Sequence, residues 1–189
     1  MEYKIFNSQI EFHKYYMDEF LSSNNNEFKI TVLDRTEALY GGEQTINKNY
    51  CDEHNIPYSQ GKLIQNTGCI IGVKGNILLD IKRKFNGGEC ICDKFSKALV
   101  EYFKSKGMNS VRQDNNDVLV DNFKVASGAE VSLENGFQYV AYQISIYQDL
   151  ETIKHACKKP MIKIPKALNE YGITTEEMLK FVKEYWNKN

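Results

Sequence analysis

Apolar residues recur every four positions between residues 8 and 23, where Phe12, Tyr16 and Phe20 are separated by polar and charged residues. This spacing puts the three rings on one face of an α-helix. We therefore predict a helix over residues 8–23 that covers one face of a sheet. Helices are also predicted for the polar segment that ends at His54 and for residues 93–106, 149–156 and 175–186.

Two of these helices carry end signals. Residues 93–106 begin with an acidic turn, end with lysines and are followed by Gly107, an order that suits the helix dipole and a glycine stop. Thr174 and Glu177 have capping-box spacing at the start of the last helix. The inward face of the first of these two helices is predicted to carry Phe95, Leu99, Tyr102 and Phe103.

Short apolar runs, separated by turn-forming pairs, predict strands. Gly75-Asn76 lies between two such runs and predicts that they pair with each other, and Asp121-Asn122 and Asn135-Gly136 predict further hairpins. Helices before, within and after the strands indicate an α+β fold with a mixed, mostly antiparallel sheet. The predicted strands are residues 28–33, 67–73, 77–81, 111–112, 118–120, 123–126, 129–133 and 137–147.

Composition and charge limit the classes of function. The 189 residues are 42% hydrophobic and 26% charged, as in a globular protein, and we expect residues 1–189 to form one domain. A net charge of −1 provides no overall attraction to nucleic acid or to an anionic membrane, so we expect neither as a partner. The chain has no export signal and no run of about 20 apolar residues, which predicts a cytoplasmic protein.

The five cysteines are an odd number with irregular spacing, and we expect reduced thiols. Cys90 and Cys92 form a C-x-C pair, but no second pair supplies the remaining ligands of a zinc site. Zinc binding is therefore disfavoured.

The centre of the chain carries a pattern that resembles a family motif. Residues 116–129 read Asn-Asp-Val-Leu-Val-Asp-Asn-Phe-Lys-Val-Ala-Ser-Gly-Ala. They resemble the motif of lipoate-protein ligases, which has Arg-Asn-Asp, an apolar strand, a turn and then Lys-(Ile/Val)-Ser-Gly-Ser-Ala. This chain has one extra residue, Ala126, and Asn115 replaces the arginine.

Weaker similarities lie on both sides of this motif, in the family's order. Residues 39–44, 49–51 and 55–57 are similar to its Gly-x-x-Gln, helix and Gly-Ile-Pro elements. Thr67-Gly68 and residues 75–77 occupy the places of its Ser/Thr-Gly-Gly-Gly and Gly-Asn-Leu elements, and residues 158–172 resemble its closing segment. The resemblance runs from about residue 39 onward and implies the fold of the biotin and lipoate ligase catalytic domain, which is like that of class II synthetases.

The resemblance implies ATP-dependent activation of lipoate or octanoate as an acyl-adenylate, with Mg²⁺, and transfer to a lysine of a lipoyl-acceptor domain. Lys124 is then the catalytic candidate, because the carboxylate and the α-phosphate repel each other and need a cation between them. The resemblance implies that Asn116 hydrogen-bonds to phosphate oxygens and that Asp117 helps to hold Mg²⁺. Glycines would let the nucleotide or the acyl chain approach the backbone closely. The implied binding residues are Thr67, Gly68, Gly75, Asn76, Asn116, Ser127 and Gly128.

The sequence also departs from the family's pattern. Where the family has Arg-Arg-x-Ser-Gly-Gly-Gly, residues 64–70 read Ile-Gln-Asn-Thr-Gly-Cys-Ile, without the two arginines. Amides replace bidentate guanidinium groups poorly, so Lys62, Lys74 and Lys82 are candidates for compensation. The alternative is a catalytically degenerate member that binds an acyl ligand or a carrier domain.

Other interpretations of the same residues stay open. Lys124 also reads as an exposed hairpin lysine, and Gly75-Asn76 as a plain turn. Cys157 suggests a cysteine-dependent octanoyltransferase of the same superfamily, against the alternative of a buried free cysteine. Biotin ligase is disfavoured, because its Gly-Arg-Gly-Arg-x-Gly-Arg loop is missing. The chain ends soon after the catalytic-domain segment, which leads us to expect no accessory C-terminal domain and, as one option, a separate accessory subunit.

Overall fold

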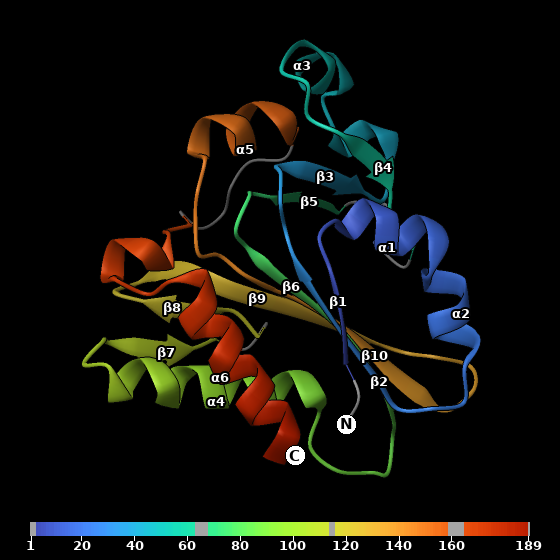
Figure 1. The fold of residues 1–189 in the computed structure, drawn as a ribbon, viewed down its shortest axis with the longest axis vertical. Helices are drawn as coiled ribbons and strands as arrows, with labels where there is room; N and C mark the ends of the chain where they lie inside the picture. Colours follow the sequence, from blue (N-terminus) through green and yellow to red (C-terminus); the bar gives the residue numbers. More distant parts are fainter. Residues whose placement is uncertain (1–2, 63–67, 114–115, 159–164, 189) are drawn as a thin grey trace.

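The computed structural model describes residues 3–62, 68–113, 116–158 and 165–188. Within these ranges a seven-stranded sheet has the order β1-β2-β6-β10-β9-β8-β7 (Figure 1). Its neighbouring strands are antiparallel apart from the parallel pair β1 and β2. The strands are β1 (Tyr3–Phe6), β2 (Glu27–Val32), β6 (Ile77–Lys84), β7 (Ser110–Arg112), β8 (Val118–Val120), β9 (Phe123–Ser132) and β10 (Phe137–Ile144).

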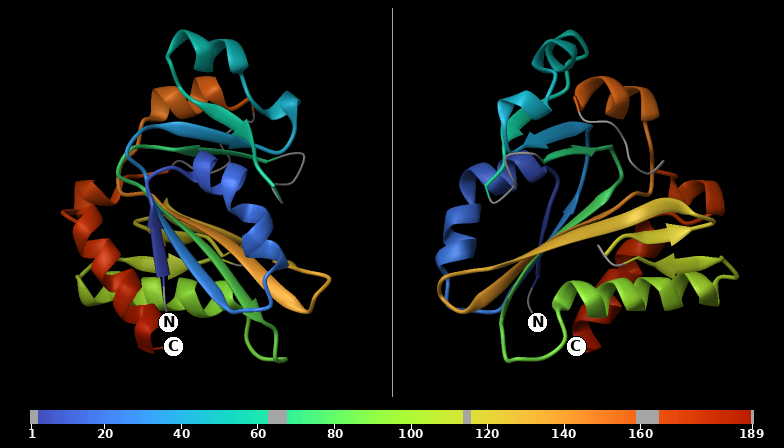
Figure 2. Two further views of the ribbon diagram at one scale, coloured as in Figure 1. Left: turned by 45° about the vertical axis from the view of Figure 1, so that its right-hand side comes forward. Right: turned by 180° about the vertical axis from the view of Figure 1, so that it is seen from behind.

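A smaller sheet lies over one face of the large sheet, next to the N-terminal helices (Figures 1 and 2). It consists of β3 (Glu37–Tyr40), which is parallel to β4 (Tyr58–Gln60) and antiparallel to β5 (Cys69–Gly72). This arrangement confirms the predicted mixed, mostly antiparallel α+β class. The helices are α1 (Gln9–Tyr15), α2 (Met17–Ser22), α3 (Lys48–Glu53), α4 (Ile91–Ser105), α5 (Leu150–Ala156) and α6 (Thr175–Lys188), with short 3₁₀ turns at η1 (Glu43–Thr45) and η2 (Leu168–Tyr171).

The main core lies between the large sheet and helices α4 and α6, which cover the face opposite the small sheet (Figure 2). Phe95, Leu99 and Phe103 of α4 are buried as predicted, because they recur on the face that meets the sheet. Trp186 of α6 packs beside Phe28 of β2 and beside Phe95, at ring-centroid distances of 4.8 and 5.7 Å. Aromatic packing therefore joins both helices to the sheet.

The N-terminal helical prediction is confirmed with one break. The helix predicted over residues 8–23 is two helices, because Tyr16 leaves helical geometry at φ −125° and caps both. Phe12 and Phe20 nevertheless point to one side, and Phe20 meets Tyr139 of β10 at 6.0 Å. The pair α1 and α2 thus covers the face of the large sheet that α4 and α6 leave open.

The predicted pairing of the strands around Gly75-Asn76 is wrong. The strands exist, but β5 belongs to the small sheet and β6 to the large one. The physical reason is that the turn bonds to Leu33 rather than closing a hairpin: the Gly75 amide donates to the Leu33 carbonyl, and the Leu33 amide to the Asn76 carbonyl. The turn therefore carries the chain from one sheet to the other.

The two strands predicted at 123–126 and 129–133 are also one strand in the structure. Ser127 and Gly128 pair with Gln143 and Tyr142 of β10, so β9 continues through the position of the expected break. Because β9 and β10 are long, this pair of strands extends beyond the part of the large sheet that the small sheet covers (Figure 2).

The side chain of Asn76 ties the turn to a distant part of the chain. It is fully buried, and its Oδ1 accepts hydrogen bonds from the amides of Ile146 and Tyr147 at 2.9 and 2.8 Å. Replacing Asn76 by Ala leaves both donors without this acceptor. We expect Asn76→Ala to lower the free energy of unfolding by roughly 2–4 kcal/mol in urea titrations.

The control is Lys74→Ala, which removes an exposed side chain from the same turn. It is expected to change the free energy of unfolding by less than about 0.5 kcal/mol. Equal effects of the two substitutions would show that the Asn76 hydrogen bonds do not hold the turn.

Candidate functional site

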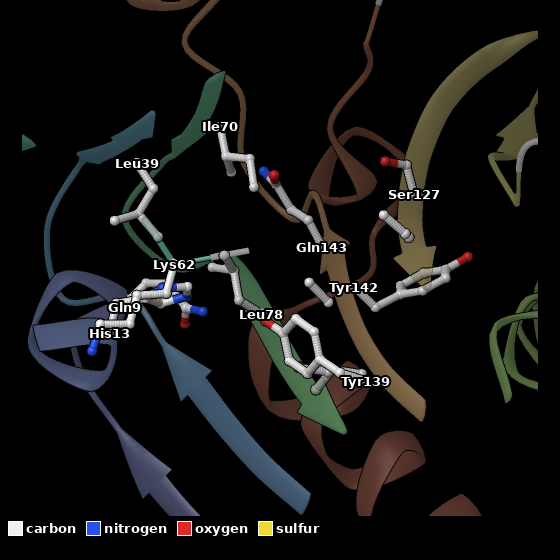
Figure 3. A pocket seen from close by; sticks show the side chains of 14 residues that line it. Gln9, His13, Leu39, Lys62, Ile70, Leu78, Ser127, Tyr139, Tyr142 and Gln143 are labelled. Carbon is white, nitrogen blue, oxygen red and sulfur yellow. The ribbon is translucent and has the colours of Figure 1, made fainter. Parts of the chain in front are cut away.

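A cavity of about 220 Å³ lies between the small sheet, the large sheet and α1. Its middle is apolar, with Leu39 and Ile70 from the small sheet facing Leu78 and Ala141 from the large one. Its two ends are polar: Figure 3 shows Gln9, His13 and Lys62 at one end and Ser127 with Tyr142 at the other. The cavity therefore suits an elongated apolar ligand with a different chemical group at each end.

The end at Ser127 contains part of the motif found in the sequence. Ser127 and Gly128 line the cavity beside Tyr142. The Tyr142 hydroxyl donates to the carbonyl of Asn116 at 3.0 Å. A Cβ at Gly128 would collide with the Tyr142 ring and the Cys92 sulfur, so this glycine is required by packing. The structure thus brings Asn116, Ser127 and Gly128 together around one tyrosine.

A β-bulge sets the direction of Lys124. Two neighbouring residues of β8 pair with Lys124 and Ala126, so Val125 is an extra residue in β9. Val125 and Ala126, although consecutive, are both buried in the main core, whereas Lys124 and Ser127 are only partly buried. In a regular strand Lys124 and Ser127 would point to opposite faces. The bulge turns them to the same face. It also accommodates the one residue that this chain has in addition to the family's motif.

The C-terminal segment returns to Lys124. Lys166 donates its amide to the Lys124 carbonyl at 3.1 Å, and Pro165 forms a parallel bridge with Lys124. Part of the predicted closing segment, residues 158–172, is therefore next to the catalytic candidate. Lys124 is not among the described residues that line the cavity itself, but it lies on the same face of β9 as Ser127.

Sequence reasoning missed Arg112 beside the motif. Arg112 pairs with Asp93 of α4, and its Nη2 donates to Asn116 Oδ1 at 2.8 Å. Asn116 has a positive φ of 62°, which suits Asn better than most residues. Arg112 is three positions before the Asn115 that replaces the family's arginine, and this nearness was the available signal. Arg112 thus provides a guanidinium group at the motif, although it stands at a different sequence position from the family's arginine.

Asp117, the predicted metal ligand, is buried next to Asn116. Burial raises the pKa of Tyr142, and the nearby Cys92 and Asp117 add smaller contributions in the same direction. Among the described residues no group of three or more metal-binding side chains is present. Mg²⁺ is commonly held by one or two carboxylates with substrate phosphates completing its shell, so a single carboxylate is compatible with it.

The other predicted residues lie elsewhere. Gly68 is beside the small sheet, where its carbonyl accepts from the Gly41 amide at 2.9 Å and from the Thr45 hydroxyl at 3.0 Å. Gly75 packs against the Tyr147 ring and Thr175, so the Gly75-Asn76 turn is not brought together with Ser127. Thr67 lies outside the described residues.

The candidate compensating lysines also differ in position. Lys62 lines the cavity and pairs with Asp18. Lys82 is fully buried and donates to the carbonyls of Phe20 and Ser23, which gives it a structural role. Lys74 is exposed on its turn.

The end of the cavity at α1 was not predicted from the sequence. Gln9 Nε2 donates to Asp80 Oδ2 at 2.8 Å, and the Tyr139 hydroxyl donates to Asp80 Oδ1 at 2.6 Å. Burial raises the pKa of Asp80 to about 6. Burial, followed by the charge of Lys62, lowers the pKa of His13 to about 4, so His13 is neutral near pH 7. The only sequence signal was a histidine next to Phe12 in the helical pattern.

Three thiols from separate segments meet at the small sheet: Cys51 of α3, Cys69 of β5 and Cys157 after α5. The Cys69 thiol donates a hydrogen bond to the Cys157 sulfur. This hydrogen bond lowers the pKa of Cys157 and, with burial, raises that of Cys69 far above its usual range. Cys157, the candidate nucleophile from the sequence, thus has a thiol hydrogen-bond partner in Cys69.

Comparisons with solved structures identify the fold. A lipoate-protein ligase A bound with ATP matches at a TM-score of 0.73 and 12% identity, over 96% of this chain and 82% of that chain. A bipartite lipoate-protein ligase from Thermoplasma acidophilum, studied with its E2 lipoyl domain, matches at 0.76 and 11% identity, over 100% and 81%. LipL1 of P. falciparum in complex with lipoate matches at 0.75 and 11% identity, over 99% and 60%.

The chain therefore has the fold of lipoate-protein ligase catalytic domains, as the order of its motifs predicts. No protein-family model matches the sequence, and no curated protein matches it. Across the ranges that the structure describes, no helix combines the length and the apolar character needed to cross a bilayer.

The burial of His13 and of Asp80 predicts two opposing effects of pH on stability. As pH falls from 6.5 to about 4, the unfolded chain binds a proton at His13 before the folded protein does, so stability falls. As pH falls from about 6 to 3.8, the folded protein binds a proton at Asp80 first, so stability rises. The two contributions largely cancel between about pH 6 and 4.

Asp80→Asn is expected to expose the His13 effect. Relative to the natural protein, its free energy of unfolding should fall by up to about 1.4 kcal/mol per pH unit between pH 6 and 4.5, measured by urea titration. His13→Asn is the matched opposite, with stability rising relative to the natural protein as pH falls. Parallel pH profiles for the three proteins would refute this assignment.

Proposed function

We propose that this chain is a lipoate-protein ligase, which activates lipoate or octanoate with ATP and transfers the acyl group to a lysine of an acceptor domain. The observation that carries the proposal is the apolar cavity with Ser127 at one end, together with the β-bulge that puts Lys124 on the same face of β9 as Ser127. The fold supports it, since proteins of this fold include a ligase bound with ATP and one in complex with lipoate.

In the first step a carboxylate oxygen of the acid bonds to the α-phosphorus of ATP, and pyrophosphate leaves. Both reacting groups are anionic, so a positioned cation lowers the barrier. Lys124 supplies this charge from a strand position, and the apolar cavity holds the chain of the acid. In the second step an acceptor lysine amine bonds to the acyl carbonyl carbon, and AMP leaves.

Residues around Asn116 complete the nucleotide end. Asp117 would hold Mg²⁺ together with phosphate oxygens, and the metal would neutralise phosphate charge. Arg112 places a guanidinium group at Asn116 and so offers part of the charge that the missing arginines supply in the family. A lipoyl-acceptor domain is the macromolecular partner, and a separate accessory subunit would supply any group still missing.

ATP dependence and five free cysteines fit a reducing, ATP-containing compartment, so we infer a cytoplasmic protein.

The test is pyrophosphate release from ATP with lipoate or octanoate. We expect release that depends on the acid and falls by roughly 10²–10³-fold in Lys124→Ala, because an electrostatic group aimed at the developing charge is lost. Lys180→Ala, which removes an exposed lysine of α6 that has no proposed role, serves as the matched control and should leave release unchanged.

Release that is equal in both variants would exclude Lys124 from the chemistry. No release from the natural protein, combined with binding of octanoate in calorimetry, would instead support the catalytically degenerate binding protein.

A second candidate function is favoured by the Cys69 to Cys157 hydrogen bond. A Cys157 thiolate would attack an acyl thioester, release its thiol and hold the acyl group for transfer to an amine. We expect octanoyl-coenzyme A to leave an octanoyl adduct, seen by intact mass, that Cys157→Ser abolishes and Cys90→Ser retains. Cys90 is exposed and does not belong to the cluster of three cysteines at the small sheet. An adduct that survives in Cys157→Ser would exclude this route.

A further inference from the structure

We propose that Cys69 and Cys157 form a redox modification site, at which a small disulfide such as oxidised glutathione converts the two thiols reversibly into an internal disulfide. The inference goes beyond the proposed function and does not depend on it. Both cysteines are partly exposed, so a small oxidant can reach them. The Cys69 thiol already donates a hydrogen bond to the Cys157 sulfur, which leaves the two sulfurs little distance to close before they bond at about 2.05 Å.

One buried residue, Thr45 of η1, connects the two backbone segments that carry these cysteines. Its hydroxyl donates to the carbonyl of Gly68, the residue before Cys69, at 3.0 Å. Its carbonyl accepts from the amide of Lys158, the residue after Cys157, at 3.0 Å. The two cysteines are thus held near each other by hydrogen bonds that do not involve their own side chains. Each thiol therefore has a high effective concentration at the other.

Each cysteine is also fixed by its own backbone pairing. Cys69 pairs with Tyr40 of β3, and Cys157 forms an antiparallel bridge with Ile46 directly after α5. The third thiol of this group, Cys51 of α3, is fully buried, so a dissolved oxidant reaches it less readily than the other two. Position and access therefore both favour the pair Cys69 and Cys157.

The pair lies on the outer face of the small sheet. Neighbouring residues of a strand point to opposite faces, and Ile70, which follows Cys69, lines the cavity. Cys69 instead packs against the cluster that contains Ile71 and Ala156, on the side of α3 and α5 and away from the large sheet (Figure 1). A disulfide here would join the sheet that forms one cavity wall to the end of α5 without entering the cavity.

The chemistry is two successive thiol–disulfide exchanges. The Cys157 sulfur, which accepts the hydrogen bond, gives up its proton and bonds to one sulfur of oxidised glutathione; one glutathione leaves and takes up a proton. The Cys69 sulfur then loses its proton and bonds to the Cys157 sulfur, and the second glutathione leaves with a proton. Two protein thiols are oxidised by two electrons, and one glutathione disulfide is reduced to two thiols. An excess of reduced glutathione reverses both steps.

Oxidation of this pair has a chemical consequence for Cys157. While the disulfide is present, its sulfur carries no free thiol, so the thioester route that would use Cys157 is closed. Disulfides in reducing compartments are usually transient and serve catalysis or redox sensing. A reversible pair at this position therefore makes Cys157 responsive to the glutathione balance.

The test exposes the whole natural protein to millimolar mixtures of reduced and oxidised glutathione, followed by an acid quench and alkylation of free thiols under denaturing conditions. As the oxidised share rises, we expect intact mass to show two fewer alkylated cysteines, and digestion without reductant to release Cys69 and Cys157 in one linked pair of peptides. The linked form should exceed the mixed disulfide with glutathione by at least about tenfold, because the second thiol is held in place. Excess dithiothreitol should restore all five thiols.

Substitutions separate this pair from the other thiols. Cys69→Ala and Cys157→Ala should each abolish the link and leave the remaining cysteine with at most one bound glutathione. Cys90→Ser is the matched control, because it removes an exposed cysteine outside the cluster, and it should form the link as the natural protein does. Cys51→Ser should also keep the link. Circular dichroism checks the folding of each variant, and peptide mapping of the natural protein requires no variant.

Three results would overturn the inference. The first is a linked pair of peptides from the natural protein that contains Cys51 in place of either proposed cysteine. The second is a loss of two thiols that persists in Cys157→Ala at the natural rate. The third is stable attachment of glutathione to Cys69 or Cys157 without an internal link, because the two sulfurs would then not reach each other.

Discussion

A carboxylate buried in the interior strand β6 determines where α1 sits. Asp80 has no access to solvent, and its charge is tolerated because Tyr139 and Gln9 donate to it from β10 and α1. A second buried carboxylate, Glu37 of β3, accepts from the first amides of α1 and from the Ser8 hydroxyl. Glu37 lies at the positive end of the helix, and Asp80 holds the side chain of its first residue. The helix is thereby fixed between the two sheets, and the cavity is the space enclosed between these three parts.

The same network explains why the cavity has two unlike ends. The Ser127 end is built from strand residues and a tyrosine, whereas the α1 end is built from side chains, of which Gln9 donates to the buried carboxylate of Asp80. The hydrogen bond from Gln9 Nε2 to Asp80 fixes the orientation of the planar amide, and with it the direction of the amide oxygen. Stabilising the buried charge therefore fixes the orientation of a side chain that lines the cavity.

Features encoded locally were predictable from the sequence, and features that depend on distant contacts were not. The periodic pattern gave α4, and Asp121-Asn122, with positive φ at both residues, is the turn expected. By contrast, the assignment of β5 to the small sheet depends on hydrogen bonds from Leu33, far away in the chain. The motif indicated Lys124 and Ser127 as candidates, but only the bulge shows that they share a face. The polarity of Gln9 in the cavity depends on Asp80 and has no signature in the sequence.

The pairing around Lys124 bears on how its charge is delivered. The backbone of this residue is held between β8 on one side and the segment at Pro165 and Lys166 on the other. Bound from both sides, it has little freedom left to lose, so ordering the charge on a ligand restricts only the torsions of the side chain. A lysine on a free loop would also lose backbone entropy in each binding event. In this protein the backbone entropy of Lys124 is lost once, during folding. Each ligand that binds therefore encounters a lysine whose backbone position is already fixed.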